Sequence, residues 1–143
     1  MSRYLLDSNI ISDAIKPFPS QSLRAWMVEQ LDEDLFIASI TVAEVWRGIL
    51  EKTGGRKRRV LEGWFRGPLG PQAKFAGRVL PFDEKAGLIW GRLMAEGTAA
   101  GHPRSAFDML LAAIAEANDC MVVTDNEKHF AGLKFINPMR PEG

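Results

Sequence analysis

The chain has 143 residues, of which 46% are hydrophobic and 25% charged, and this balance favours one globular domain over residues 1–143. The single cysteine, Cys120, excludes an internal disulfide and a Cys-x-x-Cys zinc site, so we expect a small buried side chain in a reducing compartment. No apolar run approaches the roughly 20 residues that span a bilayer. No signal peptide is recognised, so we expect a cytoplasmic protein without membrane contact.

Short apolar runs and amphipathic stretches alternate along the chain, which predicts strands connected by helices. In chain order the predicted elements are a strand at 4–6, a helix capped by Ser8 or Asn9 and ending at 15, a helix at 22–30, a strand at 35–38, helices at 41–52 and 56–65, a strand at 79–80, a helix from 83 to 97 or 101, a helix at 105–118, and strands at 121–124 and 135–136. Gly and Pro residues at 67–71 predict a firm break. Because the strands lack polar alternation, we expect an α/β fold with a mainly parallel central sheet flanked by helices on both faces.

Four carboxylates fall where a predicted strand ends or a predicted helix begins. They are Asp7, Glu44, Asp108 and Asp125. In an open parallel sheet, strand ends and helix starts on one edge converge on a crevice where ligands bind. Carboxylates crowded there repel one another unless a cation neutralises them, and a hard divalent cation with oxygen ligands suits such a cluster. The pattern therefore indicates metal-dependent chemistry, with phosphate groups as the expected target.

Each of these carboxylates also has a purely structural interpretation. Glu44 follows Thr41, and Asp108 follows Ser105, with the spacing of a capping box, in which a hydroxyl and an acid satisfy backbone donors at a helix start. The other two acids fit a turn or a helix cap. Four matching positions in one small α/β chain favour a shared site over separate caps and turns.

The rest of the sequence lacks the motifs of several other enzyme classes. There is no P-loop, no Gly-x-Gly-x-x-Gly after a strand and no Gly-x-Ser-x-Gly nucleophile motif. The only histidines, His102 and His129, lack metal-ligand spacing and are expected in loops or at the surface. A site rich in carboxylates and poor in histidine suits Mg²⁺ or Mn²⁺ better than Zn²⁺.

Four sequence blocks and a short C-terminal motif resemble the PIN-domain ribonucleases, and among them the VapC/FitB-like toxins of type II toxin–antitoxin modules. The blocks are Leu-Leu-Asp-Ser-Asn at 5–9, Ser-Ile-Thr-Val-Ala-Glu at 39–44, Ser-Ala-Phe-Asp-Met-Leu-Leu-Ala-Ala-Ile-Ala at 105–115 and Val-Val-Thr-Asp-Asn-Glu-Lys-His-Phe at 122–130, followed by Phe-Ile-Asn-Pro at 135–138. Together they cover essentially the whole chain as a single PIN domain. The resemblance implies a three-layer α/β/α PIN-like fold, Mg²⁺ as cofactor with Mn²⁺ as a substitute, and endonucleolytic cleavage of RNA. It also implies a homodimer and a cognate antitoxin that blocks the acidic site.

The resemblance assigns metal binding and catalysis to four positions, Asp7, Glu44, Asp108 and Asp125. For the fourth position the family carries an acid or Asn after Thr, so we favour Asp125, with Asn126 as an alternative or as a residue that shares the role. Asn9 and Thr124 match polar positions that support the site by hydrogen bonds. One or two ions held by the acids would activate a water for direct hydrolysis of a scissile phosphate, with Glu44 binding a second ion or orienting the water.

Basic residues are distributed unevenly along the chain. Nine of them, against two acids, lie between Arg47 and Arg78, a local excess of seven positive charges in a chain of zero net charge. This stretch contains the run Arg56, Lys57, Arg58 and Arg59. The run is interpreted either as a solvated helix start or as a contact for the RNA backbone. The four tryptophans are expected in the core, and Trp64 with Phe65 has the alternative of lining a groove for the antitoxin or a second subunit.

Two other functions compete with an active nuclease. A catalytically silent PIN scaffold that binds protein or RNA is the main alternative, although such a scaffold has no need of a complete set of acids. A phosphatase-like or phosphoryl-accepting domain would use Asp7 as a nucleophile, but there is no Asp-x-Asp motif at that residue. The complete acidic set therefore favours the nuclease.

Overall fold

Five parallel strands form the central sheet of the computed structural model, which describes residues 2–140. They are β1 (Tyr4–Leu6), β2 (Leu35–Ala38), β3 (Val79–Leu80), β4 (Met121–Val123) and β5 (Phe135–Ile136). Their order across the sheet is β3-β2-β1-β4-β5, and every neighbouring pair is parallel. Each predicted strand is therefore present.

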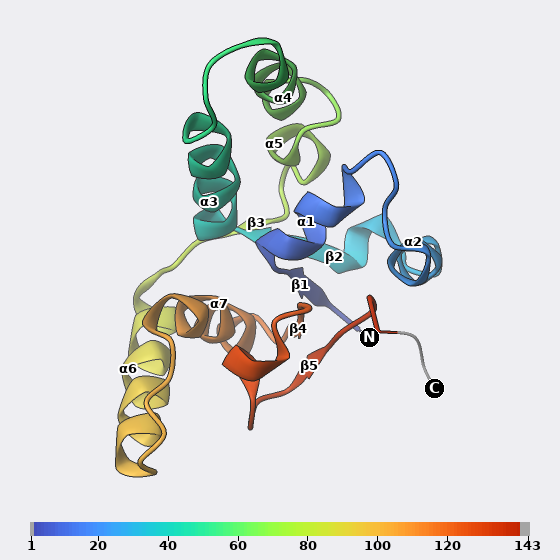
Figure 1. Ribbon diagram of the computed structural model, residues 1–143. Helices are drawn as coiled ribbons and strands as arrows, with labels where there is room; N and C mark the ends of the chain where they lie inside the picture. Colours follow the sequence, from blue (N-terminus) through green and yellow to red (C-terminus); the bar gives the residue numbers. More distant parts are fainter. Residues whose placement is uncertain (1, 141–143) are drawn as a thin grey trace.

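Helices connect the strands and cover both faces of the sheet (Figure 1). The α-helices are α1 (Ser8–Ala14), α2 (Gln21–Val28), α3 (Ser39–Leu50), α4 (Arg56–Arg66), α5 (Pro71–Lys74), α6 (Glu84–Ala99) and α7 (Ala106–Ala117), with short 3-10 helices η1 (Asp32–Asp34) and η2 (Glu127–Phe130). Over the described part of the chain, none of these helices has the length and apolar character needed to cross a bilayer.

The core is divided by the sheet into two apolar clusters. Leu5 packs in a cluster with residues of α6 and α7, whereas Leu6, the next residue of β1, packs with residues of α1 and α2. Val122 and Val123 of β4 divide between the same two clusters. Because successive side chains of a strand point to opposite faces, an all-apolar strand needs cover on both. The predicted α/β/α arrangement with a parallel sheet is confirmed.

The structure corrects the predicted start of α3. The helix begins at Ser39 rather than at Thr41, and Ala38, the last residue of β2, occupies the N-cap position in extended conformation. Because β2 runs directly into α3 without a linker, the helix starts two residues before Thr41. Thr41 lies inside the helix and is buried, so the capping box predicted with Glu44 does not form.

Two further expectations differ from the structure. Pro71 begins the short helix α5 directly after the predicted break, because its fixed φ suits the first turn of a helix. Cys120 is only half buried, since it precedes β4 at the point where the chain enters the sheet. The prediction that the tryptophans pack in the core is confirmed for Trp26, Trp64 and Trp90, which are partly buried against the two clusters, whereas Trp46 stacks on the buried Phe65.

The sheet has a topological switch point between β1 and β4. From β1 the chain moves outward to β2 and β3, and it then crosses to β4 and β5 on the other side of β1. Ligands of open α/β sheets bind at such a point, outside the carboxyl ends of the strands, and the space at the carboxyl ends of β1 and β4 is called the crevice below. Asp7 follows β1 and Thr124 follows β4, so both residues lie at this crevice.

Candidate functional site

Asp7 lies at the junction between β1 and α1. Its backbone N–H donates to the carbonyl of Val123 in β4 at 2.9 Å, which continues the ladder of the parallel pair. Its carboxylate Oδ1 accepts from the backbone N–H of Ser8 at 2.7 Å, so Asp7 itself is the N-cap of α1. The prediction that Ser8 or Asn9 caps this helix was wrong, because α1 begins at Ser8 immediately after the strand.

Two polar side chains hold the second carboxylate oxygen of Asp7. The Thr124 hydroxyl donates to Oδ2 at 2.8 Å, and the Asn9 amide donates to the same oxygen at 3.3 Å. Asn9 Oδ1 in turn accepts from the backbone N–H of Asp125 at 3.3 Å, and Thr124 Oγ1 accepts from that of Asn126 at 3.0 Å. This network ties the segment after β4 to the segment after β1 and fixes the direction of the Asp7 carboxylate.

The electrostatic environment of Asp7 is unfavourable to its charge. The side chain is only 6% exposed, and burial raises the pKa of the Asp7 carboxyl above its ordinary value. Hydrogen bonds from Thr124 and Ser8 lower this pKa, while the negative charges of Asp108 and Asp125 raise it further. Asp108 and Asp125 are therefore close enough to Asp7 to repel it.

Glu44 approaches the same centre from α3. It is the sixth residue of that helix rather than its third, and its side chain is half buried. Burial raises the pKa of Glu44, a hydrogen bond from the Ser8 side chain lowers it, and the charges of Asp7 and Asp108 raise it again. The start of α3 at the end of β2 thus brings a fourth acid to the crevice, and this acid does not cap the helix.

Asp108 is the third residue of α7, and it combines two roles. Its backbone N–H donates to the hydroxyl of the N-cap residue Ser105 at 3.3 Å, which confirms the predicted helix start. Its carboxylate does not complete a capping box but contacts the Nδ1 of His129 at 2.6 Å. Asn126 Nδ2 lies 2.8 Å from the same ring nitrogen.

His129 is a site residue that the sequence did not reveal. It is exposed, as expected for a surface histidine, but η2 directs its ring to Asp108. In the sequence, His129 does not stand at metal-ligand spacing from the other histidine. Only the fold brings η2 beside the start of α7. Its distance of three residues from Asn126 is the single local signal, because such residues share one side of a helical turn.

The structure brings all four predicted acids to one crevice. Asp7 is buried, Glu44 and Asp108 are half buried, and Asp125 is exposed at its rim. Within residues 2–140 none of Asp7, Glu44 and Asp125 forms a salt bridge with Lys or Arg. Arg47 lowers the pKa of Glu44 only as the smallest of its causes, so the repulsion among these carboxylates is only weakly relieved by a basic side chain.

This donor set fits a hard divalent cation. All four groups are carboxylates, and a cation between them would oppose both the burial and the mutual repulsion that raise the pKa values of Asp7 and Glu44. In the described part of the chain, no three His, Cys, Asp or Glu side chains already surround a common point.

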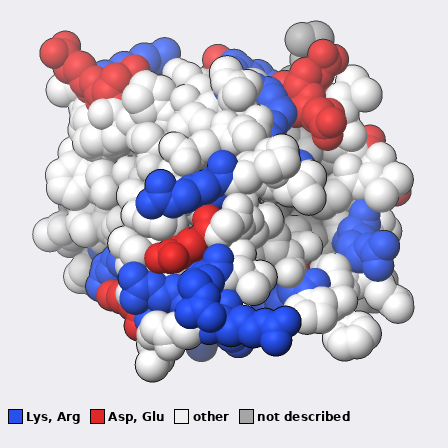
Figure 2. Space-filling view, turned by 90° about the horizontal axis from the view of Figure 1, so that it is seen from above, with Lys and Arg blue, Asp and Glu red and all other residues white. Residues whose placement is uncertain are grey.

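The predicted basic run divides between the faces of α4. Lys57 shares a face with Leu61 and Trp64 and lines a pocket beside the acids. Arg58 instead pairs with Glu62 at 3.2 Å. The other two residues of the run, Arg56 and Arg59, are exposed. Figure 2 shows the face seen from above, where Lys and Arg side chains lie on both sides of a small acidic patch.

Comparison with known proteins gives a consistent result. The PIN domain family matches residues 4–136. A VapC ribonuclease, Y4jK of Sinorhizobium fredii, is 37% identical over 139 residues, which are 96% of this chain and 98% of that protein. Toxin FitB of Neisseria gonorrhoeae is 33% identical over 94% of this chain and 96% of its own length. A solved structure of FitAB bound to a DNA fragment superposes with a TM-score of 0.88 at 32% identity, covering 98% of both chains.

Proposed function

Because the chain belongs to the PIN-domain family, we propose that it is a metal-dependent endoribonuclease that acts as the toxin of a type II toxin–antitoxin module. It hydrolyses phosphodiester bonds of RNA and is neutralised by a cognate antitoxin. The observation that carries this proposal is the gathering of three further acids around the buried, hydrogen-bonded Asp7 at the switch point of the sheet. The relatives named as a ribonuclease and as a toxin support it.

The acidic crevice would hold the cofactor. Asp7, Asp108 and Asp125 would bind Mg²⁺, or Mn²⁺ in its place, since hard oxygen donors suit both ions. When bound, such an ion supplies a water of lowered pKa and neutralises charge on the phosphate oxygens. Thr124 and Asn9 hold Asp7 in position by hydrogen bonds to Oδ2. They act on the ligand rather than on the substrate.

Glu44 would orient the attacking water or bind a second ion. Burial is the main cause that raises the pKa of Glu44, and a carboxylate with a raised pKa is a better acceptor for a proton from water. The Ser8 hydroxyl at the start of α1 holds this carboxylate beside the crevice. The site has no serine–histidine or cysteine–histidine pair, so we expect direct hydrolysis by water rather than a covalent intermediate.

The partners of the protein follow from the same proposal. FitB is named as a toxin, and the FitAB structure contains a DNA fragment. We therefore expect a cognate antitoxin that covers the acidic crevice, and a complex of the two proteins that binds DNA. We also expect the protein to be cytoplasmic and to form a homodimer. Sedimentation analysis of the purified protein checks the dimer.

Cleavage of total cellular RNA by antitoxin-free protein tests the nuclease. With Mg²⁺ we expect discrete cuts, and none with EDTA. The Asp7→Asn variant should lose about 10²-fold or more of the activity, because it removes a charged ligand while keeping its size. Circular dichroism controls for folding of the variant. If the folded, metal-loaded wild-type protein leaves varied RNAs intact, the silent binding scaffold replaces the nuclease as the proposed function.

A further inference from the structure

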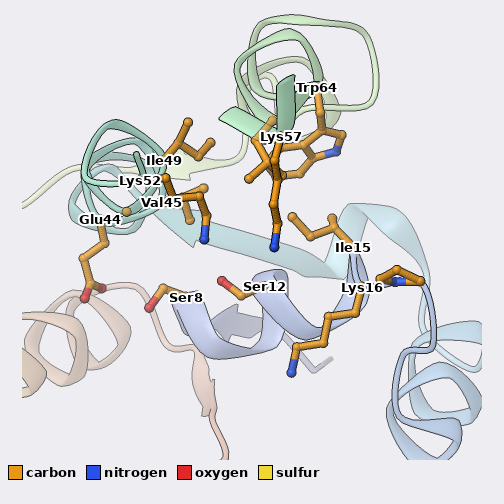
Figure 3. A pocket seen from close by; sticks show the side chains of 13 residues that line it. Ser8, Ser12, Ile15, Lys16, Glu44, Val45, Ile49, Lys52, Lys57 and Trp64 are labelled. Carbon is orange, nitrogen blue, oxygen red and sulfur yellow. The ribbon is translucent and has the colours of Figure 1, made fainter. Parts of the chain in front are cut away.

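A pocket of about 460 Å³ opens beside the acidic crevice, between α1, α3 and α4. Ser8 and Glu44 line one end of it, and both residues also belong to the surroundings of Asp7. In Figure 3, Glu44 lies beside Ser8 at one end, and the rest of the pocket extends along α1 past Ser12. A volume of this size is typical of pockets that bind small ligands, about 300–1,000 Å³.

Two lysines direct their charges into this pocket. Lys52 follows the end of α3, and Lys57 lies in the first turn of α4. Figure 3 shows both ammonium groups pointing across the pocket towards the hydroxyls of Ser8 and Ser12. Within residues 2–140 neither lysine forms a salt bridge, whereas Lys16 at the pocket rim lies 3.4 Å from Asp13. Two unneutralised ammonium groups that face one space favour an anion between them.

The remaining walls of the pocket are apolar. Val45 and Ile49 of α3 line it on one side, and Leu61 and Trp64 of α4 also belong to its lining. Gly48 lies in the α3 wall, and a Cβ added there would meet nothing within 4 Å. The pocket thus combines a cationic mouth with an apolar, partly aromatic interior. A nucleotide presents the complementary pair, an anionic phosphate and a flat base.

On the basis of the proposed nuclease function, we propose that this pocket is a substrate subsite for one nucleotide of single-stranded RNA next to the scissile phosphate. Lys52 and Lys57 bind the phosphate of that nucleotide, and the Ser12 hydroxyl donates to its ribose or phosphate oxygens, while the single Ser8 hydroxyl proton remains with Glu44. The base enters between α3 and α4 against Trp64. A base is free to enter only when it is unstacked, so the subsite selects unpaired RNA over duplex.

Binding of a short single-stranded RNA in EDTA tests the lysines without cleavage. The affinity is measured against salt concentration for wild type, Lys52→Met and Lys57→Met, which keep the aliphatic stems. Each variant should weaken binding and reduce the slope of log K against log salt by about 0.7, the value for one lost phosphate contact on a single strand. Lys85→Met, an exposed position on α6, should leave both quantities unchanged.

A second pair of variants blocks the pocket without changing its charge. Gly48→Leu projects into the pocket and should weaken both RNA binding and cleavage. Gly63→Leu is the matched control, because it lies in α4 outside the pocket and its Cβ also meets nothing within 4 Å. It should bind and cleave RNA as wild type does. Thermal unfolding of both variants separates blocking from misfolding.

The outcomes separate this subsite from the nuclease proposal. If Lys52→Met, Lys57→Met and Gly48→Leu keep wild-type RNA binding while the wild type cleaves RNA, the subsite is wrong and the nuclease stands. If these variants lose only affinity for the antitoxin, the pocket is a protein contact, and the subsite is again wrong. If they lose RNA binding but the wild type never cleaves RNA with Mg²⁺, the pocket binds RNA, whereas the nuclease and with it the substrate role of the pocket are wrong.

Discussion

At the scale of single residues, Asp7 serves the fold and the site at once. One carboxylate oxygen caps α1 through Ser8, and the other is held by Thr124 and Asn9. The same side chain is buried and repelled by neighbouring acids, so its pKa is raised. A carboxylate that is firmly positioned yet poorly neutralised is ready to bind a cation.

The raised pKa of Asp7 predicts how stability depends on pH. Between the unfolded and the folded pKa, the native state binds more protons than the unfolded state, so the free energy of unfolding falls as the pH rises. Relative to Asp7→Asn, the wild type should therefore lose stability from about pH 4, the unfolded value for Asp, up through the raised folded pKa. Urea denaturation of both proteins in EDTA measures the difference. If the free energy of unfolding of the wild type instead rises relative to Asp7→Asn with increasing pH, the pKa of Asp7 is not raised in the folded state.

His129 gives a second prediction at this scale. Its ring contacts the Asp108 carboxylate at 2.6 Å, so His129→Ala should leave Asp108 less well positioned. Loss of a residue that supports a metal ligand typically weakens metal binding or activity by about 10–100-fold. The Mg²⁺ concentration that gives half-maximal cleavage should rise by that order. His102→Ala, at the other histidine, serves as the control, and equal behaviour of the two variants would remove His129 from the site.

At the scale of elements, the starts of α1, α3 and α7 determine where the acids lie. Each of these helices contributes an acid at or near its start, but by a different route. Asp7 is an N-cap, Glu44 lies in the second turn, and Asp108 follows the N-cap Ser105. A capping pattern therefore did not exclude a site role, because the same positions that cap a helix also face the crevice.

The corrected start of α3 leads to a prediction about Thr41. Its hydroxyl is buried and has no hydrogen-bond partner among the described residues. Thr41→Val keeps the shape and removes the unsatisfied group, so it should raise the free energy of unfolding by about 1 kcal/mol. Thr41→Ser keeps the hydroxyl and loses a methyl group, so this variant should lower the free energy of unfolding by a similar amount. Chemical denaturation of both variants checks the pair, and a destabilised Thr41→Val would mean that the hydroxyl has a partner.

At the scale of the whole molecule, the strand order assembles the site. Asp7 and Asp125 become neighbours only because β4 pairs with β1 rather than with β3, which precedes it in sequence. The acids then repel one another across the crevice. If the proposed metal site is correct, the folded state is the state that would bind the cation, since the unfolded chain separates these side chains.

Mg²⁺ should for this reason stabilise the fold. At an ion concentration of 100 times Kd, the expected gain in unfolding free energy is about 2.7 kcal/mol, visible as a rise in Tm. Asp7→Asn should show a much smaller rise, and EDTA should reverse the effect in the wild type. A Tm that does not respond to Mg²⁺ or Mn²⁺ would contradict a metal site in the crevice.

The sequence by itself determined the elements and the identity of the acids. Apolar runs between amphipathic stretches predicted each of the five strands, because burial on both faces leaves a strand without polar positions. The family motifs then selected Asp7, Glu44, Asp108 and Asp125, whose catalytic roles are still predictions. Helix boundaries were less certain: Thr41 looked like a cap because local pattern does not show that a strand runs directly into the helix.

Only the tertiary structure decided which residues meet. The contact of His129 with Asp108, the hydrogen bond from Thr124 to Asp7 Oδ2 and the pocket between α1, α3 and α4 all join segments that are distant in sequence. The tertiary structure also separates the residues of the basic run, because Lys57 lines the pocket whereas Arg58 pairs with Glu62. The physical reason is that local pattern fixes which face of an element is apolar. The strand order and the packing of helices on the sheet then fix which polar groups share a space.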